Sequence, residues 1–453
     1  MVGNVVLFTR DLRVRDNPAL HTALTADGPT TALFVYDDEA LQHHTSQNRR
    51  EYLDEALSEL AESLGRAGIE FEVVRSGGSF VDTVRATALD RHAAAVHQAR
   101  DYSGFAARRS ARLRAELARH DVALVEHDGI AVVAPGRLLP AGRDHYSVFT
   151  PFYRRWRATN WGRPLPAPAA DDGHHSKPRA LTAEPNDVSQ SSPGREPGGE
   201  TAALRRLARW AATDLADYAQ NHDALGSDRT SRISAALHFG CLSAREVAVR
   251  LVSRPGGEEF VRQLAWRDFF LQLLAARPET ARVDVRPRSF RPRAFPSRSS
   301  AEDFEAWCLG RTGVPIVDAA MRQLRGEGFV HNRARMVTAS FLTKDLAIDW
   351  RHGAAEFQRW LTDGDVAQNQ LNWQWVAGTG TDSNPHRIFN PVLQSRRFDP
   401  DGTYIRRYVA ELRDIPTPEI HDPGPMTRAA VGYPPALVDH AQAVNEYRAR
   451  LRP

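Results

Sequence analysis

The first 130 residues alternate short apolar runs with amphipathic segments. Runs typical of buried strands lie at residues 5–8, 31–36, 69–74, 94–97 and 122–126. Between the second and third runs, apolar residues from Leu53 to Leu64 recur at helical spacing, and we expect Gly65 and Gly68 to close that helix. Asn17-Pro18 is typical of a helix start. Strands alternating with helices predict a Rossmann-like α/β domain over residues 1–130, with a five-stranded parallel sheet covered on both faces.

The turn after the first predicted strand reads Thr9-Arg10-Asp11-Leu12-Arg13. A dinucleotide site needs glycines at this place, because the backbone must turn tightly and approach the pyrophosphate. The turn therefore argues against dinucleotide binding there. A pocket elsewhere at the carboxyl ends of the strands is still compatible with a parallel sheet.

Residues 131–200 form a predicted linker between two domains. From Arg163 to Glu200 the chain is rich in Pro, Gly, Ser and Asp and has no sustained period, which predicts an irregular connection on the surface. Helical spacing follows at Leu204, Leu207, Ala211, Leu215 and Tyr218, and again over residues 260–274 and 316–324. We therefore expect an all-α domain over residues 201–453.

Composition sets broad limits on the class of protein. A chain of 453 residues with 42% hydrophobic and 25% charged residues is typical of a globular protein with two or three domains. Because no apolar run could span a bilayer and the N-terminus shows no export signal, we expect a cytoplasmic protein with no membrane partner. Cys241 and Cys308 are too few for a disulfide framework or a cysteine-rich metal site.

The charge balance does not decide whether the partner is a nucleic acid. The net charge is +3 and the pI is about 9.0, with Arg far more frequent than Lys. This excess permits a polyanionic partner. A preference for Arg imposed by a GC-rich genome explains it slightly better, so any argument for DNA binding must come from the positions of the arginines.

Two short clusters combine charge with hydroxyl or aromatic groups. Thr230 to Ser234 (TSRIS) is a hydroxyl-rich turn around one Arg, suited to holding phosphates. Ser and Thr are also the usual helix caps, and taken alone the turn favours a capped helix start. Trp266-Arg267-Asp268 lies in an apolar helical run, where charges must be paired or face a polar cavity. A structural salt bridge explains this pair as well as a ligand site does.

A third cluster, His331 to Arg335 (HNRAR), carries two arginines two residues apart. Such residues face roughly opposite sides of a helix, so we expect Arg333 to point outward toward nucleic acid phosphate and Arg335 inward to a carboxylate. Asp363-Gly364-Asp365 offers two carboxylates on a turn. No further ligand stands at metal-binding spacing, so we expect no metal and assign an acid here as the partner of Arg335.

Tryptophan is concentrated at Trp350, Trp360 and Trp373-Gln374-Trp375. Indoles stack on bases and donate electrons. Any one of them could be ordinary core. For the cluster beside Asn369 we favour a functional explanation.

These segments together resemble the photolyase/cryptochrome family, most closely its bacterial class I members that act on cyclobutane pyrimidine dimers. The motifs that carry the resemblance are Thr230–Ser234, Trp266–Phe269, Thr312–Leu324 (TGVPIVDAAMRQL), His331–Met336, Asp363–Asn369 and Asn372–Asp382 (NWQWVAGTGTD). The resemblance implies an α/β domain, a long connection and a helical domain that binds FAD. It implies light-driven repair of thymine dimers flipped out of damaged DNA, by electron transfer from the reduced flavin. It also implies a monomer with no obligate protein partner.

The resemblance assigns roles to individual residues. FAD binding is implied for Tyr218, Thr230, Ser231, Arg232, Ile233, Ser234, Arg267, Asn332, Arg335, Asp363, Asp365 and Asn369. The catalytic positions around the lesion and flavin are Trp266, Gln263, Asn332, Met336, Asn369 and Trp375. Electron transfer is implied for Trp350 and Trp373, and contact with DNA phosphates for Arg333, Arg396 and Arg397.

Two positions depart from the family pattern. Gln263 stands where bacterial members have Glu, and an amide cannot give up a proton, so we expect some loss of rate. Ser297 stands ten residues before Trp307, where the outer tryptophan of the family's electron path belongs. The nearest aromatics are Phe290 and Phe295, which are poor donors. We predict that light-driven reduction of the flavin is weak or leaves through another residue such as Trp360.

Two alternatives to cyclobutane dimer repair stay open at this point. Related enzymes that split (6-4) photoproducts use two histidines, whereas Asn332 and Met336 occupy the matching region here. A cryptochrome that signals light to a partner is the main alternative; cryptochromes often add a C-terminal tail, and this chain ends at Pro453. Both are less favoured than cyclobutane dimer repair.

A second, light-harvesting chromophore is also implied by the resemblance. Ala106-Ala107 replaces the Asn-Glu of folate-binding members, whereas Arg49 and Asp101 match positions of deazaflavin-binding members. We therefore expect 8-hydroxydeazaflavin rather than folate. The alternative is that Arg49 and Asp101 are surface charges beside an empty pocket.

Overall fold

The computed structural model describes residues 2–40, 46–171, 191–287, 292, 295 and 297–451. Contacts divide the chain into two compact units. Unit 1 comprises residues 1–190, 196–216 and 231–279, and unit 2 comprises residues 191–195, 217–230 and 280–453. Both units combine segments separated in the sequence, so this division is a different description from the predicted domains at 1–130, 131–200 and 201–453, which stay a prediction.

Unit 1 contains the predicted parallel sheet. Its five strands lie in the order β3-β2-β1-β4-β5, and all four pairings are parallel. The bounds are β1 (Gly3–Phe8), β2 (Thr30–Tyr36), β3 (Glu70–Arg75), β4 (Ala93–Ala99) and β5 (Ala123–His127). Each predicted strand is present with its ends moved by one or two residues. The central strand β1 is buried along its whole length, which explains its unbroken apolar run.

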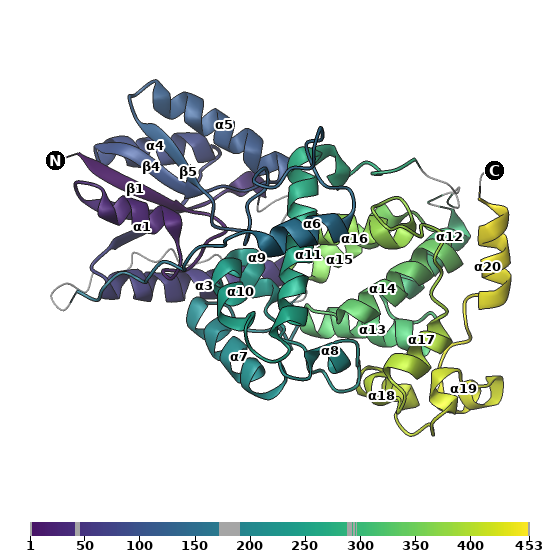
Figure 1. Cartoon of the computed structure of the whole chain (residues 1–453). Coiled ribbons are helices and arrows are strands. Elements are labelled where there is room, and N and C mark those ends of the chain that lie inside the picture. The colour runs from purple at the N-terminus through teal and green to yellow at the C-terminus, as the bar shows by residue number, and fades with distance from the viewer. Residues whose placement is uncertain are drawn as a thin grey trace. The chain divides into compact units, whose positions relative to one another are not determined.

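Helices cover both faces of this sheet. The helices of unit 1, of which α1, α3, α4 and α5 contact the sheet, are α1 (Pro18–Thr25), α3 (Gln47–Arg66), α4 (Phe80–Asp90), α5 (Gly104–Ala118), α6 (Phe149–Ala158), α7 (Glu200–Thr213), α9 (Ser234–Phe239), α10 (Ala244–Leu251) and α11 (Gly257–Ala276). α4 and α5 pack on one side and α1 on the other (Figure 1). This follows from right-handed crossovers in a sheet whose order reverses at β1. α1 begins as predicted, with Asn17 accepting the N–H of Leu20.

Two predicted helix ends are wrong. Gly65 lies inside α3, which runs on to Arg66, and only Gly68 with its φ of +70° follows the helix end. The spacing that continued to Leu215 and Tyr218 does not belong to one helix, because α7 ends at Thr213 and Tyr218 begins the short α8 (Tyr218–Asn221). The apolar spacing predicted a longer helix because single apolar residues in the turn after α7 happen to match helical spacing.

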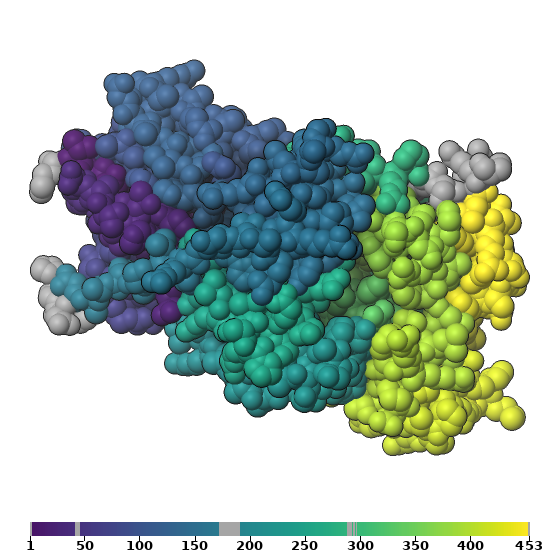
Figure 2. Space-filling view, viewed as in Figure 1, coloured from purple at the N-terminus to yellow at the C-terminus, as the bar shows by residue number. Residues whose placement is uncertain are grey.

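The predicted surface connection is only partly on the surface. Gly198 and Gly199 are buried, and a Cβ added to Gly198 would lie 2.3 Å from the carbonyl oxygen of Tyr52 on α3. Glycine is required there because the backbone approaches α3 closely. Residues 172–190 of this connection lie outside the described residues. The segment between β5 and α6 is exposed over most of residues 136–144, on the face of unit 1 seen in Figure 2.

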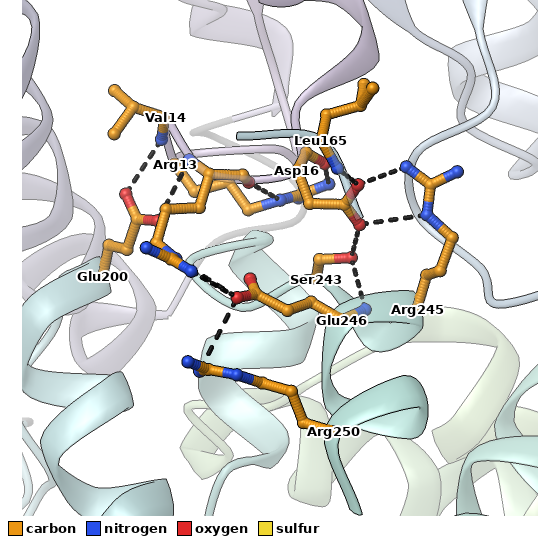
Figure 3. A network of polar contacts seen from close by, with 10 residues as sticks. Arg13, Val14, Asp16, Leu165, Glu200, Ser243, Arg245, Glu246 and Arg250 are labelled. Atoms are coloured by element: carbon orange, nitrogen blue, oxygen red, sulfur yellow. Dashed lines mark hydrogen bonds and ion pairs between the residues drawn. The ribbon is translucent and has the colours of Figure 1, made fainter. Parts of the chain in front are cut away.

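A buried polar network holds the loop after β1 in place (Figure 3). Glu200 at the start of α7 accepts the backbone N–H of Arg15 at 3.1 Å, and burial raises the pKa of this carboxyl to about 7. The guanidinium of Arg15 lies 2.8 Å from Glu246 on α10. Arg245 donates from Nε to Asp16 at 3.1 Å. The turn after β1 carries charged residues and no glycine. The residues that follow it, Arg15 and Asp16, bind α7 and α10.

Unit 2 is helical, and no β-strand occurs among its described residues. Its longer helices are α12 (Arg298–Cys308), α13 (Pro315–Glu327), α14 (Asn332–Ser340), α15 (Trp350–Trp360) and α16 (Val366–Ala377). The π-helix η3 (Phe341–Asp345) continues α14, and α17 (Pro391–Phe398), α18 (Thr403–Tyr408), α19 (Pro425–Val431) and α20 (His440–Ala449) follow. α13 contacts α12, α14, α15, α17 and α18, so it forms the centre of the unit's core. In the described part of the chain, no helix has the length and apolar character needed to cross a membrane.

Candidate functional site

Helix α11 of unit 1 carries the Trp266-Arg267-Asp268 cluster. Asp268 is fully buried, and its Oδ2 accepts N–H groups from Trp156 Nε1 at 2.8 Å and from Val133 at 2.9 Å. Burial raises the pKa of this carboxyl to about 6, although the Arg267 charge acts in the opposite direction. Asp268 therefore anchors α11 to the chain that follows the sheet.

Arg267 is also held by groups of unit 1. Its Nη1 donates to the carbonyl oxygen of Ile130 at 2.8 Å and its Nη2 to that of Leu237 at 3.1 Å. Only 8% of the residue is exposed. The sequence left open whether Arg267 and Asp268 have a structural role or bind a ligand. The contacts of Arg267 are structural, and a role of Arg267 toward FAD stays a prediction.

Trp266 lies half-buried on the same helix. Its indole stacks on Phe149 of α6, with ring centres 3.6 Å apart and planes 5° from parallel. Phe149 in turn stacks on Tyr153. One face of the indole is thus covered by a phenyl ring that fixes its plane. We did not predict Phe149; the aromatic run FTPFYRRW over residues 149–156 was the available signal.

Gln263 lies one turn before Trp266 and is exposed. Its Nε2 donates to the carbonyl oxygen of Glu259 at 3.3 Å. The neighbouring Arg262 places its guanidinium 5.6 Å from the centre of the Phe149 ring. An amide and a guanidinium therefore border the aromatic stack on α11.

The TSRIS turn does not cap a helix. α9 begins at Ser234, its N-cap is Ile233, and no side chain caps it. Arg232 has a φ of +50°, a left-handed conformation that is uncommon outside glycine. Thr230 Oγ1 is buried and has no hydrogen-bond partner among the described residues. The capped helix start, which the sequence alone favoured, is therefore wrong. The turn instead begins with a buried hydroxyl, that of Thr230, which has no partner in the described part of the chain.

The two arginines of α14 in unit 2 both face carboxylates. Arg335 Nη2 lies 2.8 Å from Asp363 Oδ2, which confirms the predicted ion pair. Arg333 Nη2 lies 2.6 Å from Asp223 Oδ2, and its Nε is 3.3 Å from Oδ1. The expectation that Arg333 points outward is wrong, because Asp223, which the helical spacing could not reveal, lies within reach.

The acids and amides after Asp363 have separate local roles. Asp365 caps α16 by accepting the N–H of Gln368 at 2.9 Å. Asn369, one turn later and 6% exposed, donates from Nδ2 to the carbonyl oxygen of Ala354 at 3.0 Å. This contact leaves Oδ1 of Asn369 as an acceptor. Asp363 Oδ1 is buried with no hydrogen-bond partner in the described part of the chain.

Three further predicted residues lie beside these elements. Asn332 at the start of α14 is exposed, and its Nδ2 lies 3.9 Å from the sulfur of Met336. Tyr218 begins α8, and burial raises the pKa of its phenol. Asn332 and Met336 thus lie together on one helix face.

The Trp373-Gln374-Trp375 triplet on α16 divides into buried and half-exposed rings. Trp373 is 3% exposed, whereas Trp375 is half-buried with the Arg387 guanidinium 5.3 Å from its ring centre. Gln374 is fully buried: Nε2 donates to the carbonyl oxygen of Thr280 at 2.6 Å, and Oε1 accepts the N–H of Val285 at 2.8 Å. Gln374 therefore anchors α16, and Trp375 remains accessible.

Trp350 and Trp373 occupy neighbouring helices. A Cβ added to Gly353, in the first turn of α15, would lie 2.3 Å from the ring of Trp373, so that ring packs directly on the turn that begins with Trp350. Trp350 is 2% exposed and donates from Nε1 to Asp284 at 2.8 Å. The structure thus places the two predicted electron-transfer residues on helices in contact, with the Trp373 ring against the first turn of α15.

Ser297 has a structural role of its own. It is the N-cap of α12 and forms a capping box with Ser300. Trp307, further along the same helix, is fully buried. A serine at this position stabilises the start of α12, whereas an indole there could not cap the helix. Phe295 packs on His352 with ring centres 3.9 Å apart, and Phe290 lies outside the described residues.

Basic residues gather around Phe398 at the end of α17. The guanidinium of Arg333 lies 4.3 Å and that of Arg397 5.0 Å from the centre of its ring. Arg396 and Arg397 are exposed. The structure therefore brings Arg333 and Arg397 together at the Phe398 ring, and Arg396 and Arg397 are open to solvent.

The two residues predicted to bind a second chromophore are not surface charges. Arg49 in α3 is 6% exposed. Asp101, after β4, pairs with Arg10 at 3.3 Å and is also largely covered. Both positions belong to unit 1. The alternative that they are surface charges is wrong, and a chromophore beside them stays a prediction.

Two family models match the chain. The model described as DNA photolyase matches residues 4–169, and the model described as FAD binding domain of DNA photolyase matches residues 260–453. The first range contains all five strands of the parallel sheet except Gly3, and the second contains α12 to α20. Of the motifs identified in the sequence, those from Trp266 to Asp382 lie within the second range, and Thr230–Ser234 lies between the two ranges.

Characterised relatives align over nearly the whole length. The deoxyribodipyrimidine photo-lyase of Streptomyces griseus is 46% identical, with 97% of this chain and 97% of that protein covered. A bacterial class III photolyase from Agrobacterium tumefaciens has a TM-score of 0.88 at 30% identity, over 99% of this chain and 97% of that chain. A cryptochrome from Synechocystis has a TM-score of 0.84 at 30% identity, with 99% of both chains covered.

A third solved structure contains a second chromophore. The photolyase from Sulfolobus tokodaii, whose structure holds two FAD molecules, has a TM-score of 0.82 at 28% identity, over 99% of this chain and 99% of that chain. The matches thus agree in fold, in length and in the flavin-binding region. The chain belongs to the DNA photolyase family.

Proposed function

We propose that this protein uses light to repair cyclobutane pyrimidine dimers in DNA, with FAD as its cofactor. Two half-exposed indoles, Trp266 in unit 1 and Trp375 in unit 2, carry this proposal. Each lies one or two positions in the sequence from a buried polar residue that anchors its helix. Asp268 and Gln374 are those anchors, and both are fully buried. Flat, fixed aromatic rings suit a flipped-out base, and stacking contributes about 1–3 kcal/mol per base.

The polar groups left over in the described residues fit FAD. Thr230 Oγ1 is buried without a partner beside Ser231 and Arg232, a donor set suited to a pyrophosphate. Asp363 Oδ1 is likewise without a hydrogen-bond partner in the described part of unit 2. We propose that FAD is held by these residues together with Tyr218, Ile233, Ser234, Arg267, Asn332, Arg335, Asp365 and Asn369. When bound, FAD in its reduced and photoexcited form supplies the single electron that opens the cyclobutane ring.

The chain contributes a neutral polar environment for the isoalloxazine ring. Arg335 and Asp363 compensate each other's charge at 2.8 Å. Asn369 brings an acceptor oxygen without charge, because its Nδ2 is used by Ala354. This arrangement suits a reduced flavin, which carries an N–H to donate and a negative charge that a carboxylate in place of Asn369 would oppose.

The lesion would be recognised by stacking and by its polar edges. Trp266 and Trp375 stack on the pyrimidine rings, and Gln263 and Asn332 offer amide donors to the carbonyl edges. Met336 adds a polarizable side chain next to Asn332. Because Gln263 cannot transfer a proton, it contributes binding and not acid catalysis.

We place the contact with DNA phosphates on Arg396 and Arg397. Both are exposed on α17, whereas Arg333 is paired with Asp223. Arg333 also lies over the ring of Phe398, and a contact of Arg333 with a flanking phosphate stays a prediction. Contacts of this kind make binding to DNA weaken as salt rises.

We further propose a light-harvesting chromophore in unit 1, near Arg49 and Asp101, with 8-hydroxydeazaflavin favoured over folate because Ala106 and Ala107 offer no polar group. A buried Arg and a covered Asp support a ligand more than surface charges do. The Sulfolobus structure with two FAD molecules supports a second flavin as the alternative. We also propose a cytoplasmic monomer with no obligate protein partner.

A light receptor without catalysis is the second candidate function, favoured by the similarity to the Synechocystis cryptochrome. Three side chains favour repair over this alternative. Asn369 has an uncharged amide that is held by the carbonyl oxygen of Ala354, and Trp266 and Trp375 are half-exposed. A receptor has no need of accessible indoles for a base.

One assay distinguishes these functions. Purified protein containing FAD is reduced chemically and mixed with oligonucleotides that carry a thymine cyclobutane dimer or a (6-4) photoproduct, in light and in darkness. We expect restored thymines from the cyclobutane dimer in light only. Repair of the (6-4) lesion alone would assign the other enzyme activity, and repair of neither lesion would favour the receptor.

A further inference from the structure

Trp350 has an unusual pair of neighbours. Its Nε1 donates to Asp284 Oδ1 at 2.8 Å, and the Arg351 guanidinium lies 4.8 Å from the centre of its ring. Arg351 Nη2 is 3.0 Å from the same carboxylate oxygen. The side chain of Asp284 is 17% exposed, and Trp350 itself is 2% exposed. A buried indole thus has a carboxylate on its N–H and a cation over its face, all within unit 2.

We propose that Asp284 is the proton acceptor that makes Trp350 the terminal electron donor for flavin reduction, in place of the outer indole that Ser297 replaces. This proposal rests on the electron-transfer role proposed for Trp350 and Trp373. Beyond these two indoles, the step needs only the carboxylate of Asp284, and the nearby charge of Arg351 favours it without being required.

The step balances in atoms and charge. Trp373 gives one electron to the bound flavin, and Trp350 gives one electron to Trp373, which is thereby restored. The proton on Trp350 Nε1 moves to Asp284 Oδ1, so Trp350 becomes a neutral radical and Asp284 a neutral acid. A thiolate in solution later returns one electron to Trp350, and Asp284 returns the proton.

The neighbours of Trp350 favour the loss of this proton. A positive charge on the ring would lie about 5 Å from the Arg351 guanidinium and be repelled by it. Loss of the N–H proton removes that charge. Asp284 is already at the distance that proton transfer requires. The electron cannot return to Trp350 without the proton, so the charge-separated state lasts longer.

A route through Trp307 lacks such an acceptor. Trp307 lies edge-to-face with Trp373, with ring centres 6.1 Å apart, so it can exchange electrons with it. However, Trp307 is fully buried and donates its N–H to the carbonyl oxygen of Thr338 at 3.3 Å. A backbone carbonyl does not take up a proton near neutral pH. An electron hole that reaches Trp307 therefore returns to Trp373.

Trp360 offers a matched control within the same helix. Its Nε1 donates to Glu356 Oε1 at 2.8 Å, and the Arg325 guanidinium lies 4.4 Å from its ring centre. The two indoles of α15 thus share the same chemistry. Only Trp350 begins the turn on which Trp373 packs. Glu356→Gln therefore removes an equivalent acceptor from the competing exit.

The test is transient absorption of the oxidised protein with bound FAD, in H2O and D2O, which distinguishes protonated from neutral tryptophan radicals. In the parent protein we expect a neutral radical that forms more slowly in D2O and disappears in Trp350→Phe. Asp284→Asn, which keeps an acceptor for the indole N–H but takes no proton, should lower its yield about tenfold, since positioned proton acceptors contribute factors of this size or more. Glu356→Gln should leave it unchanged.

Two controls separate this proposal from its alternatives. Arg351→Gln removes the ion pair and keeps the carboxylate, so the neutral radical should persist if proton acceptance, and not folding around Asp284, is what matters. Chemically reduced Asp284→Asn should repair dimers at the parent rate, which keeps the outcome independent of the proposed function. Loss of the radical in Glu356→Gln, or its full retention in Asp284→Asn, would overturn the proposal.

Discussion

Helices α11 and α16 solve the same local problem with different chemistry. Each presents a half-buried indole, Trp266 or Trp375, and each has a fully buried polar residue one or two positions away in the sequence. Asp268 on α11 accepts N–H groups of Trp156 and Val133. The buried anchor fixes the helix, and this leaves the indole free to meet a ligand.

The anchors differ in charge. Asp268 is an ionisable group whose pKa burial raises to about 6, next to the Arg267 cation. Gln374 is neutral and uses both ends of its amide. An accessible aromatic ring thus needs a rigid support, and that support can be ionic or neutral. The two cases should respond differently to truncation and to pH.

The largest effect is expected for Asp268→Ala. This change removes the carboxylate beside the buried Arg267 cation, which keeps only its other contacts, and leaves the N–H of Trp156 without its acceptor. We expect a loss of about 3–5 kcal/mol in the free energy of unfolding. Urea denaturation monitored by tryptophan fluorescence measures it. A loss below that of a typical surface substitution would mean that Asp268 is not an anchor.

The second effect is a dependence on pH that only α11 should show. Folding raises the pKa of Asp268 from 3.8 to about 6, so the folded chain holds this proton more tightly. The contribution of the group to stability is therefore greatest below pH 4 and is lost as the pH rises through 6. The free energy of unfolding of the parent, relative to that of Asp268→Asn, should therefore decrease by up to about 3 kcal/mol as the pH rises from 4 to 7. A difference that is flat over this range would contradict the shift.

Gln374→Ala should destabilise less. It leaves the carbonyl oxygen of Thr280 and the N–H of Val285 without their partner, at a cost of about 2 kcal/mol. Because no charge is exposed or buried, the same loss is expected at pH 4 and at pH 7. A loss that varies with pH would remove the distinction between the two anchors.

A smaller effect is expected from the ring that supports Trp266. Phe149→Leu keeps apolar volume and removes the flat contact at 3.6 Å, which is worth about 0.5–1.5 kcal/mol in such pairs. Affinity for DNA with a cyclobutane dimer, measured in darkness, should fall about fivefold. Phe149→Tyr should restore it, and a failure of this rescue would mean that the plane of the ring is not what matters.

The smallest effect is expected where a cation supports the indole. Arg387 lies 5.3 Å from the ring of Trp375, an exposed arrangement worth about 0.5–1 kcal/mol. Arg387→Gln should weaken dimer binding only two- to threefold, and the loss should shrink at high salt. An effect larger than that of Phe149→Leu would reverse the order of the two supports.

The sheet could be predicted because its central strands are buried. An unbroken apolar run such as Val5 to Phe8 is typical of a strand covered on both faces when helices alternate with it. Helix ends could not be placed from glycines alone, because Gly65 is buried inside the last turn of α3 and does not end the helix. The close approach at Gly198 needed contacts with a distant segment, and composition alone made that segment look like a surface loop.

The candidate site was predictable where motifs carried it and not where partners came from elsewhere. The Arg335–Asp363 pair followed from a charged residue in need of a carboxylate. Asp223, the partner of Arg333, lies 110 residues away in the sequence and has no motif. Asp284, beside Trp350, likewise lies in a segment without any recognised pattern. Charge partners that are distant in sequence leave no periodic trace.

The central claim is the proposal that Trp266 and Trp375 each contribute to binding of the lesion. The direct measurement is dark binding of the protein to oligonucleotides with and without one thymine dimer, for the parent, Trp266→Ala and Trp375→Ala. We predict that each substitution lowers the preference for damaged DNA at least about tenfold, as expected for one lost base–aromatic stack, with little change for undamaged DNA. A preference for damaged DNA that survives the loss of both indoles would contradict this claim.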